Sequence, residues 1–329
     1  MSHSFIFDES IPFDERAERV FRFQYEKNAV YREFCNTLES KYESFIGKGV
    51  YPLLPVRAFK EADVISFSKN EAELVFKSSG TGEMQRSRHY LKSPELYRQS
   101  VVQGFSCFYD PSDFTILCYT SGYDDNPDSS LVYMLNLLCK LDKANQSRFL
   151  LLGKPLVKSE IGKIKKSGKR VMLFGAAFGL LDLAGVSGIR LPAESVVIET
   201  GGMKTYRREM TKDELHGRLS QGFGISRDQV HSEYGMCELL SQAYATEDGW
   251  FETSHWMQAR IYDPENPMRT CKPGEEGKIG ILDLANYESC SFLLTDDKGV
   301  MDERGRFRVL GRWNSSDLRG CNFLIDRDL

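Results

Sequence analysis

The chain has 329 residues, enough for about two domains at roughly 150 residues each. Its net charge of −4 and pI near 5.9 leave no excess of basic side chains, so the sequence argues against nucleic acid as the main partner. No apolar run approaches the ~20 residues that a membrane span needs, and the first residues lack the basic start and apolar core of a signal peptide. We therefore expect a globular, cytoplasmic protein without a membrane span.

The cysteines and histidines show no metal or disulfide pattern. The eight cysteines contain no C-x-x-C pair, and no two of the five histidines stand four residues apart. Such a distribution in a large acidic chain predicts reduced thiols and argues against zinc held by thiolates or imidazoles.

Helical and strand patterns alternate along the first 250 residues. Apolar residues at helical spacing predict one or two amphipathic helices within residues 13–46. Ser93-Pro94-Glu95 has the N-cap and first-turn proline of a further helix. Short apolar runs predict strands at residues 72–77, 114–118, 149–152, 170–174 and 195–199. This alternation favours an α/β fold with a mostly parallel sheet covered by helices.

The pattern changes after about residue 250. Short strands joined by turns rich in glycine, proline and aspartate are predicted at residues 260–262, 277–284, 292–295 and 307–310. Strands joined by such short turns indicate an antiparallel, barrel-like β subdomain.

A loop of small polar residues follows the strand at 72–77. It consists of Ser78, Ser79, Gly80, Thr81 and Gly82. Two glycines let the backbone turn its N–H groups inward and three hydroxyls add donors, which is how a loop holds a polyphosphate. No Gly-Lys-Ser/Thr follows, so the loop is not a Walker motif. Arg86, Arg88 and His89 are candidates to face phosphates, and a solvated turn is the alternative.

Two further short motifs carry possible chemistry. In Tyr234-Gly235-Met236-Cys237-Glu238, the aromatic ring can stack on a purine and the carboxylate can hold Mg²⁺ against phosphate oxygens. Gly201-Gly202-Met203-Lys204 follows an apolar strand and can equally be a tight turn with an exposed lysine. Each motif is commonplace when taken alone.

The order of the motifs resembles the core motif series of the adenylate-forming superfamily, which includes acyl-CoA synthetases and peptide-synthetase adenylation domains. The series is Ser-Ser-Gly-Thr near residue 80, Gly-Gly at 201–202, Tyr-Gly-x-x-Glu at 234–238, Pro-Gly-Glu-x-Gly at 273–277 and Thr-x-Asp at 295–297, followed by Gly311-Arg312. A closer likeness is to the bacterial acyl-protein synthetases of bioluminescence operons, the fatty-acid–luciferin-component ligases. It rests on residues 76–90, where Ser-Arg-His follows the phosphate loop, and on residues 129–134 and 199–204.

The resemblance implies a domain plan and a set of binding roles. Residues 1–311 would form the large adenylation domain, with a helical part at 1–60 and the β subdomain at about 250–311. Residues 312–329 would be a hinge remnant and tail, with the lid domain essentially missing. The cofactors would be ATP and Mg²⁺. Their implied contacts are the loop of Ser78, Ser79, Gly80, Thr81 and Gly82 with Arg88 and His89 at the β,γ-phosphates, Gly201 and Gly202 at adenine, Tyr234 and Gly235 at the base, Asp297 at the ribose and Glu238 at Mg²⁺.

The implied reaction is ATP-dependent activation of a long-chain fatty or related carboxylic acid to acyl-AMP, with transfer to a protein cysteine. Near the C-terminus Cys321 matches the acyl-accepting thiol, while Lys204 and Arg312 are the other catalytic candidates. An acyl reductase or acyl-carrier protein is the implied partner. Two alternatives remain open: a carboxylate–CoA or carrier-protein ligase of the phenylacetate-ligase type, and a degenerate member that binds nucleotide or lipid without activity. Glu83, which stands where relatives usually have a neutral residue, favours the last because a carboxylate facing the phosphates would oppose ATP binding.

Overall fold

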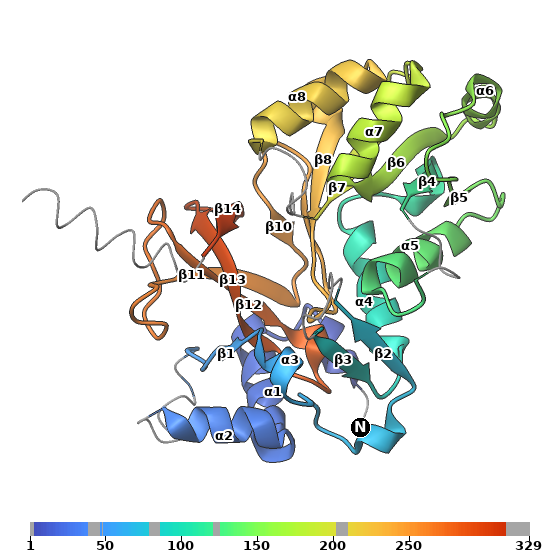
Figure 1. Ribbon diagram of the computed structural model, residues 1–329. Coiled ribbons are helices and arrows are strands. Elements are labelled where there is room, and N and C mark those ends of the chain that lie inside the picture. The colour runs from blue at the N-terminus through green and yellow to red at the C-terminus, as the bar shows by residue number, and fades with distance from the viewer. Residues whose placement is uncertain are drawn as a thin grey trace, which may run out of the picture. The chain divides into compact units, whose positions relative to one another are not determined.

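A computed structural model describes residues 3–38, 47, 49–78, 86–120, 126–201 and 210–313 (Figure 1). The chain divides into two compact units. The first unit comprises Met1–Leu74, Ser87–Ser93 and His255–Leu329, and the second comprises Val75–Arg86 and Pro94–Ser254. The N-terminal helices and the C-terminal strands therefore share one unit, although the whole second unit separates them in the sequence.

The second unit is built on a seven-stranded sheet in the order β10-β9-β8-β7-β6-β4-β5. Its strands are β4 (Phe114–Tyr119), β5 (Arg148–Phe149), β6 (Arg170–Ala176), β7 (Val196–Thr200), β8 (Val230–Tyr234), β9 (Ala243–Ala245) and β10 (Glu252–Thr253). Strands β4, β5, β6, β7 and β8 run parallel to one another, whereas β9 pairs antiparallel with both β8 and β10. The central strands are buried along their length; β4 and most of β7 accordingly appear in the sequence as apolar runs, whereas β8 carries the buried polar residues His231, Ser232 and Glu233.

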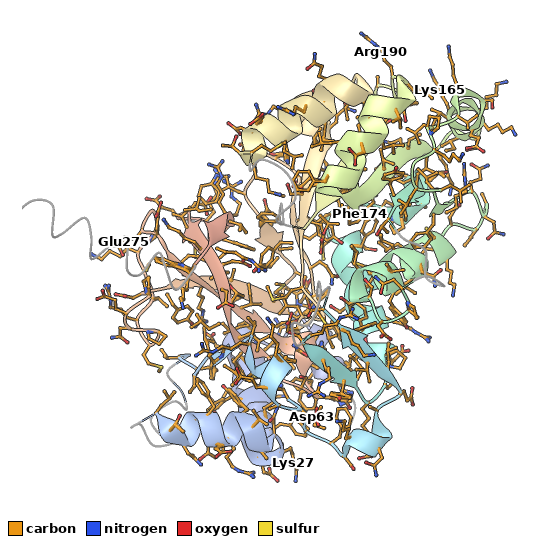
Figure 2. All side chains as sticks on the ribbon, viewed as in Figure 1. Lys27, Asp63, Lys165, Phe174, Arg190 and Glu275 are labelled. Atoms are coloured by element: carbon orange, nitrogen blue, oxygen red, sulfur yellow. The ribbon has the colours of Figure 1, made fainter. Side chains whose placement is uncertain are left out.

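Helices cover the faces of this sheet. They are α4 (Glu95–Ser106), α5 (Ser130–Lys140), α6 (Lys158–Lys166), α7 (Ala177–Ser187) and α8 (Lys212–Phe223), with short 3-10 turns η4 (Pro111–Asp113) and η5 (Arg227–Gln229). Leucines of α7 and α8 pack on Val171, Leu173 and Val197 of the sheet, and the two helices lie side by side (Figure 1). Phe174 is buried in the sheet, whereas Lys165 and Arg190 project into solvent (Figure 2).

The first unit is built on a five-stranded sheet in the order β1-β13-β12-β11, with β14 paired to β13. Its strands are β1 (Leu54–Pro55), β11 (Met257–Tyr262), β12 (Gly277–Asp283), β13 (Phe292–Met301) and β14 (Phe307–Arg312). The antiparallel strands expected after residue 250 are thus confirmed, and β1 adds a parallel edge. The remaining elements of the first unit are η1 (His3–Phe7), α1 (Phe13–Lys27), α2 (Ala29–Thr37), α3 (Ala58–Glu61), η3 (Lys69–Glu71), β3 (Arg88–Leu91) and η6 (Leu284–Asn286). Strand β2 (Leu74–Lys77) has its first residue in the first unit and the other three in the second.

Buried amides join α1 to the C-terminal part of the first unit. The Gln24 side chain donates to the carbonyl oxygens of Asn286 and Tyr287, both at 2.9 Å, and accepts from the Ser291 amide. Asn28 donates to the Ser289 carbonyl at 2.9 Å. Because buried polar groups need partners, these bonds fix the helix on the region between β12 and β13.

Two sequence predictions differ in detail from the structure. The strand expected at residues 149–152 is wrong beyond Phe149: β5 ends there, and Leu151 and Leu152 are 77% and 56% exposed. The apolar run predicted a strand, but only Arg148 and Phe149 pair with β4. In addition, α4 begins at Glu95 with Pro94 as its N-cap, one residue later than Ser93-Pro94 suggested. Within the described ranges, no helix is long and apolar enough to cross a membrane.

Candidate functional site

The predicted site residues divide into three groups. Those outside the described residues are Ser79, Gly80, Thr81, Gly82, Gly202, Lys204 and Cys321, and Glu83 is also among them. Those in the second unit are Ser78, Gly201, Tyr234, Gly235 and Glu238, and those in the first unit are Arg88, His89, Asp297 and Arg312. The described residues are taken unit by unit below.

Both flanks of the phosphate-loop motif are held by the second unit. Phe76 on β2 is fully buried, and its ring contacts that of Tyr97 on α4 edge-on, with centroids 5.3 Å apart. Lys77 donates its amide to the Asp128 carbonyl at 2.8 Å and its ammonium to the Asp128 carboxylate at 2.7 Å. Arg86 Nε donates to the Ser78 carbonyl at 2.6 Å, so the residues on either side of 79–85 are bonded to each other. The sequence named Arg86 as a candidate to face phosphates. In the structure its side chain bonds the Ser78 carbonyl, and the phosphate contact stays a prediction.

The adenine motifs meet at the carboxyl edge of the parallel sheet. Thr200 at the end of β7 pairs in register with Glu233 near the end of β8. Gly201 and Tyr234 are the next residues along each strand, so the register brings the two predicted motifs together. Gly201 has a φ of +83°, which glycine adopts readily. The carboxyl edge is also where open α/β sheets bind their ligands.

Tyr234 and Glu238 lie on the stretch that leaves this edge. The Tyr234 ring is 9% exposed and contacts Phe251 edge-on, with centroids 5.8 Å apart. Glu238 is 8% exposed, in the turn after β8. Among the described residues, no group of three or more His, Cys, Asp or Glu side chains could hold a metal. A single carboxylate nevertheless suits Mg²⁺, which takes most of its ligands from phosphate oxygens and water.

In the first unit, the predicted ribose aspartate and the following arginine are neighbours. Asp297 and Arg312 face each other across the antiparallel pair β13–β14, with Arg312 Nε 3.4 Å from Asp297 Oδ1. The Asp297 amide donates to Thr295 Oγ1 at 3.1 Å, and that hydroxyl donates to the Ile279 carbonyl at 2.7 Å. Asp297 is largely buried, whereas the Arg312 side chain is 61% exposed. The sheet therefore orients the aspartate, and the arginine that pairs with it remains mostly exposed to solvent.

Arg88 and His89 lie on β3, also in the first unit. Arg88 stands 3.6 Å from the Asp63 carboxylate. His89 is 1% exposed, and its ring contacts Phe59 edge-on, with centroids 5.4 Å apart. A phosphate-binding role for these two side chains stays a prediction.

Sequence reasoning assigned no role to a buried polar cluster around the ends of β7 and β8. Glu199 is fully buried and accepts from Lys212 and Ser232, and His216 Nε2 lies 3.5 Å from the same carboxylate oxygen. His216 Nε2 also lies 3.1 Å from Ser232 Oγ. One residue further along, the Thr200 hydroxyl donates to the carboxylate of Glu233. For Glu199 the sequence signal was an acidic residue at the end of an apolar run; Glu233 stands in the polar segment His231-Ser232-Glu233 and gave no such signal.

The two carboxylates titrate in opposite directions. Burial alone would raise the pKa of Glu199, yet the nearby Lys212 ammonium and the bonds from His216, Lys212 and Ser232 bring it below its ordinary value. Burial raises the pKa of Glu233 to about 7, against the opposing hydrogen bond from Thr200. Glu199 is thus held as an anion, and Glu233 exchanges its proton near neutral pH.

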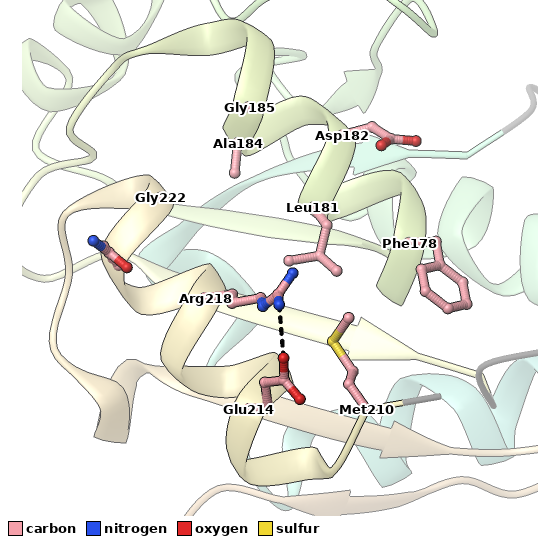
Figure 3. Close-up of a pocket in the computed structure, with 10 residues that line it drawn as sticks. Phe178, Leu181, Asp182, Ala184, Gly185, Met210, Glu214, Arg218 and Gly222 are labelled. Carbon is pink, nitrogen blue, oxygen red and sulfur yellow. Dashed lines mark hydrogen bonds and ion pairs between the residues drawn. The ribbon is translucent and has the colours of Figure 1, made fainter. Parts of the chain in front are cut away.

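A separate cavity of about 490 Å³ opens between α7 and α8 (Figure 3). Its lining includes Phe178, Leu181 and Met210, and Arg218 donates to Glu214 at 2.7 Å at its edge. None of the predicted site residues that the structure describes lines this cavity, so it is distinct from the carboxyl-edge site.

Comparison with known proteins now gives the family. The family described as "Acyl-protein synthetase, LuxE" matches residues 138–329, more than half of the chain. The chain belongs to this family. The long-chain-fatty-acid–luciferin-component ligase of Vibrio harveyi is 23% identical over 332 residues, which cover 92% of this chain and 84% of that protein. The family predicted from the motif series is therefore confirmed.

Solved structures confirm the adenylate-forming fold. An open conformation of 2-hydroxyisobutyryl-CoA ligase, in complex with 2-HIB-AMP and CoA, aligns with a TM-score of 0.62 at 12% identity and covers 91% of this chain and 69% of that one. ATP-bound MatB from Rhodopseudomonas palustris aligns with a TM-score of 0.51 at 17% identity and covers 75% and 49%. Family and fold together identify an AMP-forming ligase and support ATP-dependent activation of a fatty acid with transfer to protein.

Proposed function

We propose that this acyl-protein synthetase joins a long-chain fatty acid to ATP, forming acyl-AMP and pyrophosphate, and passes the acyl group to its own Cys321. The observation that carries the proposal is the convergence of Gly201 with Tyr234 at the carboxyl edge, in a chain that belongs to this family. The Asp297–Arg312 pair adds support from the first unit.

In the first step, a carboxylate oxygen of the fatty acid attacks the α-phosphorus of ATP, and the bond to the pyrophosphate oxygen breaks. Tyr234 stacks on adenine, Asp297 accepts from the ribose hydroxyls, and the loop at Ser78–Gly82 donates to the β,γ-phosphates. Mg²⁺ held by Glu238 would neutralise charge on the departing pyrophosphate. Removing one such preorganised contact typically costs about 3–4 kcal/mol, or about 10²–10³ in rate.

In the second step, the Cys321 thiolate attacks the acyl carbonyl, a thioester forms, and AMP departs with the electron pair of the broken carbon–oxygen bond. The thiol loses its proton beforehand, and the positive charge of Arg319, two residues before Cys321, would favour the thiolate. The thioester then serves an acyl reductase or an acyl-carrier protein. Lys204 would orient the fatty carboxylate or the α-phosphate in the first step.

Intact mass and peptide mapping after incubation with ATP, Mg²⁺ and a long-chain fatty acid test this proposal. We expect a hydroxylamine-labile acyl adduct on the peptide containing Cys321, absent from Cys321→Ser but present in the matched control Cys107→Ser, which removes an exposed cysteine. Cys321→Ser should retain ATP–pyrophosphate exchange, because only the second step needs the thiol.

Other outcomes point to the alternatives. An unmodified protein that forms acyl-CoA or an acylated carrier would make it a ligase with an external acceptor. Absence of ATP–pyrophosphate exchange with every acid tried would make it a nucleotide- or lipid-binding member without activity.

A further inference from the structure

The carboxyl group of Glu233 bridges the two turns that leave the parallel sheet. One of its oxygens, Oε2, accepts from the Thr200 hydroxyl, directly before Gly201. The other, Oε1, lies so close to Gly235 that a Cβ on that residue would overlap it. A single side chain on β8 therefore contacts the end of β7 and lies beneath the turn that follows Tyr234.

The Glu233–Thr200 bond is buried, and few charged groups offset the cost of burying the Glu233 carboxyl. Glu233 and Thr200 are both 6% exposed. The salt bridges found among the described residues do not include Glu233. The charged groups that act on it are Glu199, which raises its pKa, and Lys212, which lowers it; Tyr244, opposite Glu233 on β9, is a buried phenol.

Burying the Glu233 carboxyl in this way lowers the stability of the folded chain, which suggests that its position serves the site. Among the described residues, Thr200 is the one hydrogen-bond donor to the Glu233 carboxyl, so the buried group exchanges hydration for a single bond. Glycine at 235 leaves room for this approach, since a side chain there would force the carboxyl oxygen to shift. What the arrangement provides is a fixed distance between the backbone at Gly201 and the backbone at Tyr234–Gly235.

We propose that Glu233 is a positioning residue, which, through its bond from Thr200, sets the spacing of the Gly201 and Tyr234–Gly235 turns for the adenosine moiety of ATP. The inference deepens the proposed function and rests on it for the identity of the ligand. Glu233 itself touches no reacting atom. Its effect is therefore expected on nucleotide binding rather than on fatty-acid binding.

The test combines backbone exchange with nucleotide affinity. Hydrogen–deuterium exchange of the peptides spanning 196–201 and 230–240 is compared in wild type, Thr200→Val, Glu233→Ala and Glu233→Gln. The matched control is Thr115→Val, which removes a fully buried hydroxyl from β4 of the same sheet. ATP affinity is measured by calorimetry on the same proteins, and KM values for ATP and for the fatty acid are measured separately.

We expect Thr200→Val and Glu233→Ala to speed exchange in both peptides by about tenfold, to weaken ATP binding by about tenfold and to leave the KM for fatty acid unchanged. Glu233→Gln should restore both readouts to near wild type, because an amide keeps an acceptor for Thr200. Thr115→Val should leave both peptides as in wild type.

Unchanged exchange in Thr200→Val and Glu233→Ala, or equal loss of ATP and fatty-acid binding, would overturn the positioning role. A wild-type protein that binds no ATP would instead refute the proposed function, while the exchange comparison would still decide whether Glu233 holds the two turns.

Discussion

Replacing Glu233 by glutamine is expected to stabilise the protein at and above neutral pH. The carboxyl has an ordinary pKa of 4.5, and burial raises it to about 7 in the folded state. Each tenfold change in acidity corresponds to 1.36 kcal/mol, so the folded state disfavours the Glu233 anion by about 3 kcal/mol. Glutamine has nearly the same shape and keeps an acceptor for Thr200, yet it never carries this charge.

The sign follows from proton linkage. Below pH 4.5 both folded and unfolded chains hold the Glu233 proton, and the stabilising contribution is fully present. As the pH rises towards 7 the unfolded chain loses the proton first, so the wild type loses stability across this window. The advantage of Glu233→Gln should therefore be less than about 1 kcal/mol at pH 5 and reach about 3 kcal/mol at pH 8.

Urea unfolding of wild type and Glu233→Gln at pH 5, 6, 7 and 8 measures this difference. Other groups titrate in the same range, but they are common to both proteins and cancel in the comparison. Glu247→Gln, at an exposed position of the same unit, is the matched control and should parallel wild type. A Glu233→Gln advantage that stays constant within about 0.5 kcal/mol from pH 5 to pH 8 would refute the reasoning.

Three further changes have definite expected outcomes. Lys212→Met leaves the fully buried Glu199 carboxylate without its cation. Because Lys212 is 44% exposed, we expect the free energy of unfolding in urea at pH 7 to fall by about 1–2 kcal/mol, less than for a fully buried pair. Below pH 4.5 the loss should be smaller, because Glu199 then becomes protonated and the ion pair no longer stabilises the wild type. Equal destabilisation at both pH values would contradict this. If Asp297 accepts from the ribose as proposed, Asp297→Asn should raise the KM for ATP at least tenfold in ATP–pyrophosphate exchange and leave the KM for fatty acid unchanged; a matching rise for both substrates would argue against that role. Gly280→Ala should cost about 1–3 kcal/mol by thermal unfolding, because its Cβ would overlap Leu53, and a wild-type melting temperature would show that the sheet can yield there.

Most of the architecture could be predicted from the sequence, because its strands are unambiguous. Residues 114–118, 170–174 and 195–199 are continuous apolar runs, and each became a buried strand of the parallel sheet. The motif order then identified the family, which the comparison confirmed. The run at 149–152 shows the limit of this reasoning, since apolar character alone cannot say where strand pairing ends.

The candidate site was only partly predictable. Tyr234 and Gly201 could be named from their motifs, but their proximity depends on the register of β7 with β8, which composition does not reveal. The same register buries Glu199 and Glu233. The sequence does not show that burial raises the pKa of Glu233, or that Lys212, His216 and Ser232 lower the pKa of Glu199 despite its burial.

The bonds from Gln24 and Asn28 to the region between β12 and β13 also bear on how the chain is made. On a ribosome α1 emerges long before Asn286 and Ser289 exist to receive its amides, whereas the strands of the second unit are contiguous in the sequence and can pair as they appear. The entropy of closing so long a loop grows only slowly with its length, so the sequence separation costs little stability in the finished protein. The contacts of α1 form late because their partners are synthesised late. We therefore expect the second unit to fold first during translation. Until the C-terminal strands are synthesised, the apolar face of α1 stays exposed in the nascent chain, where a chaperone would bind it.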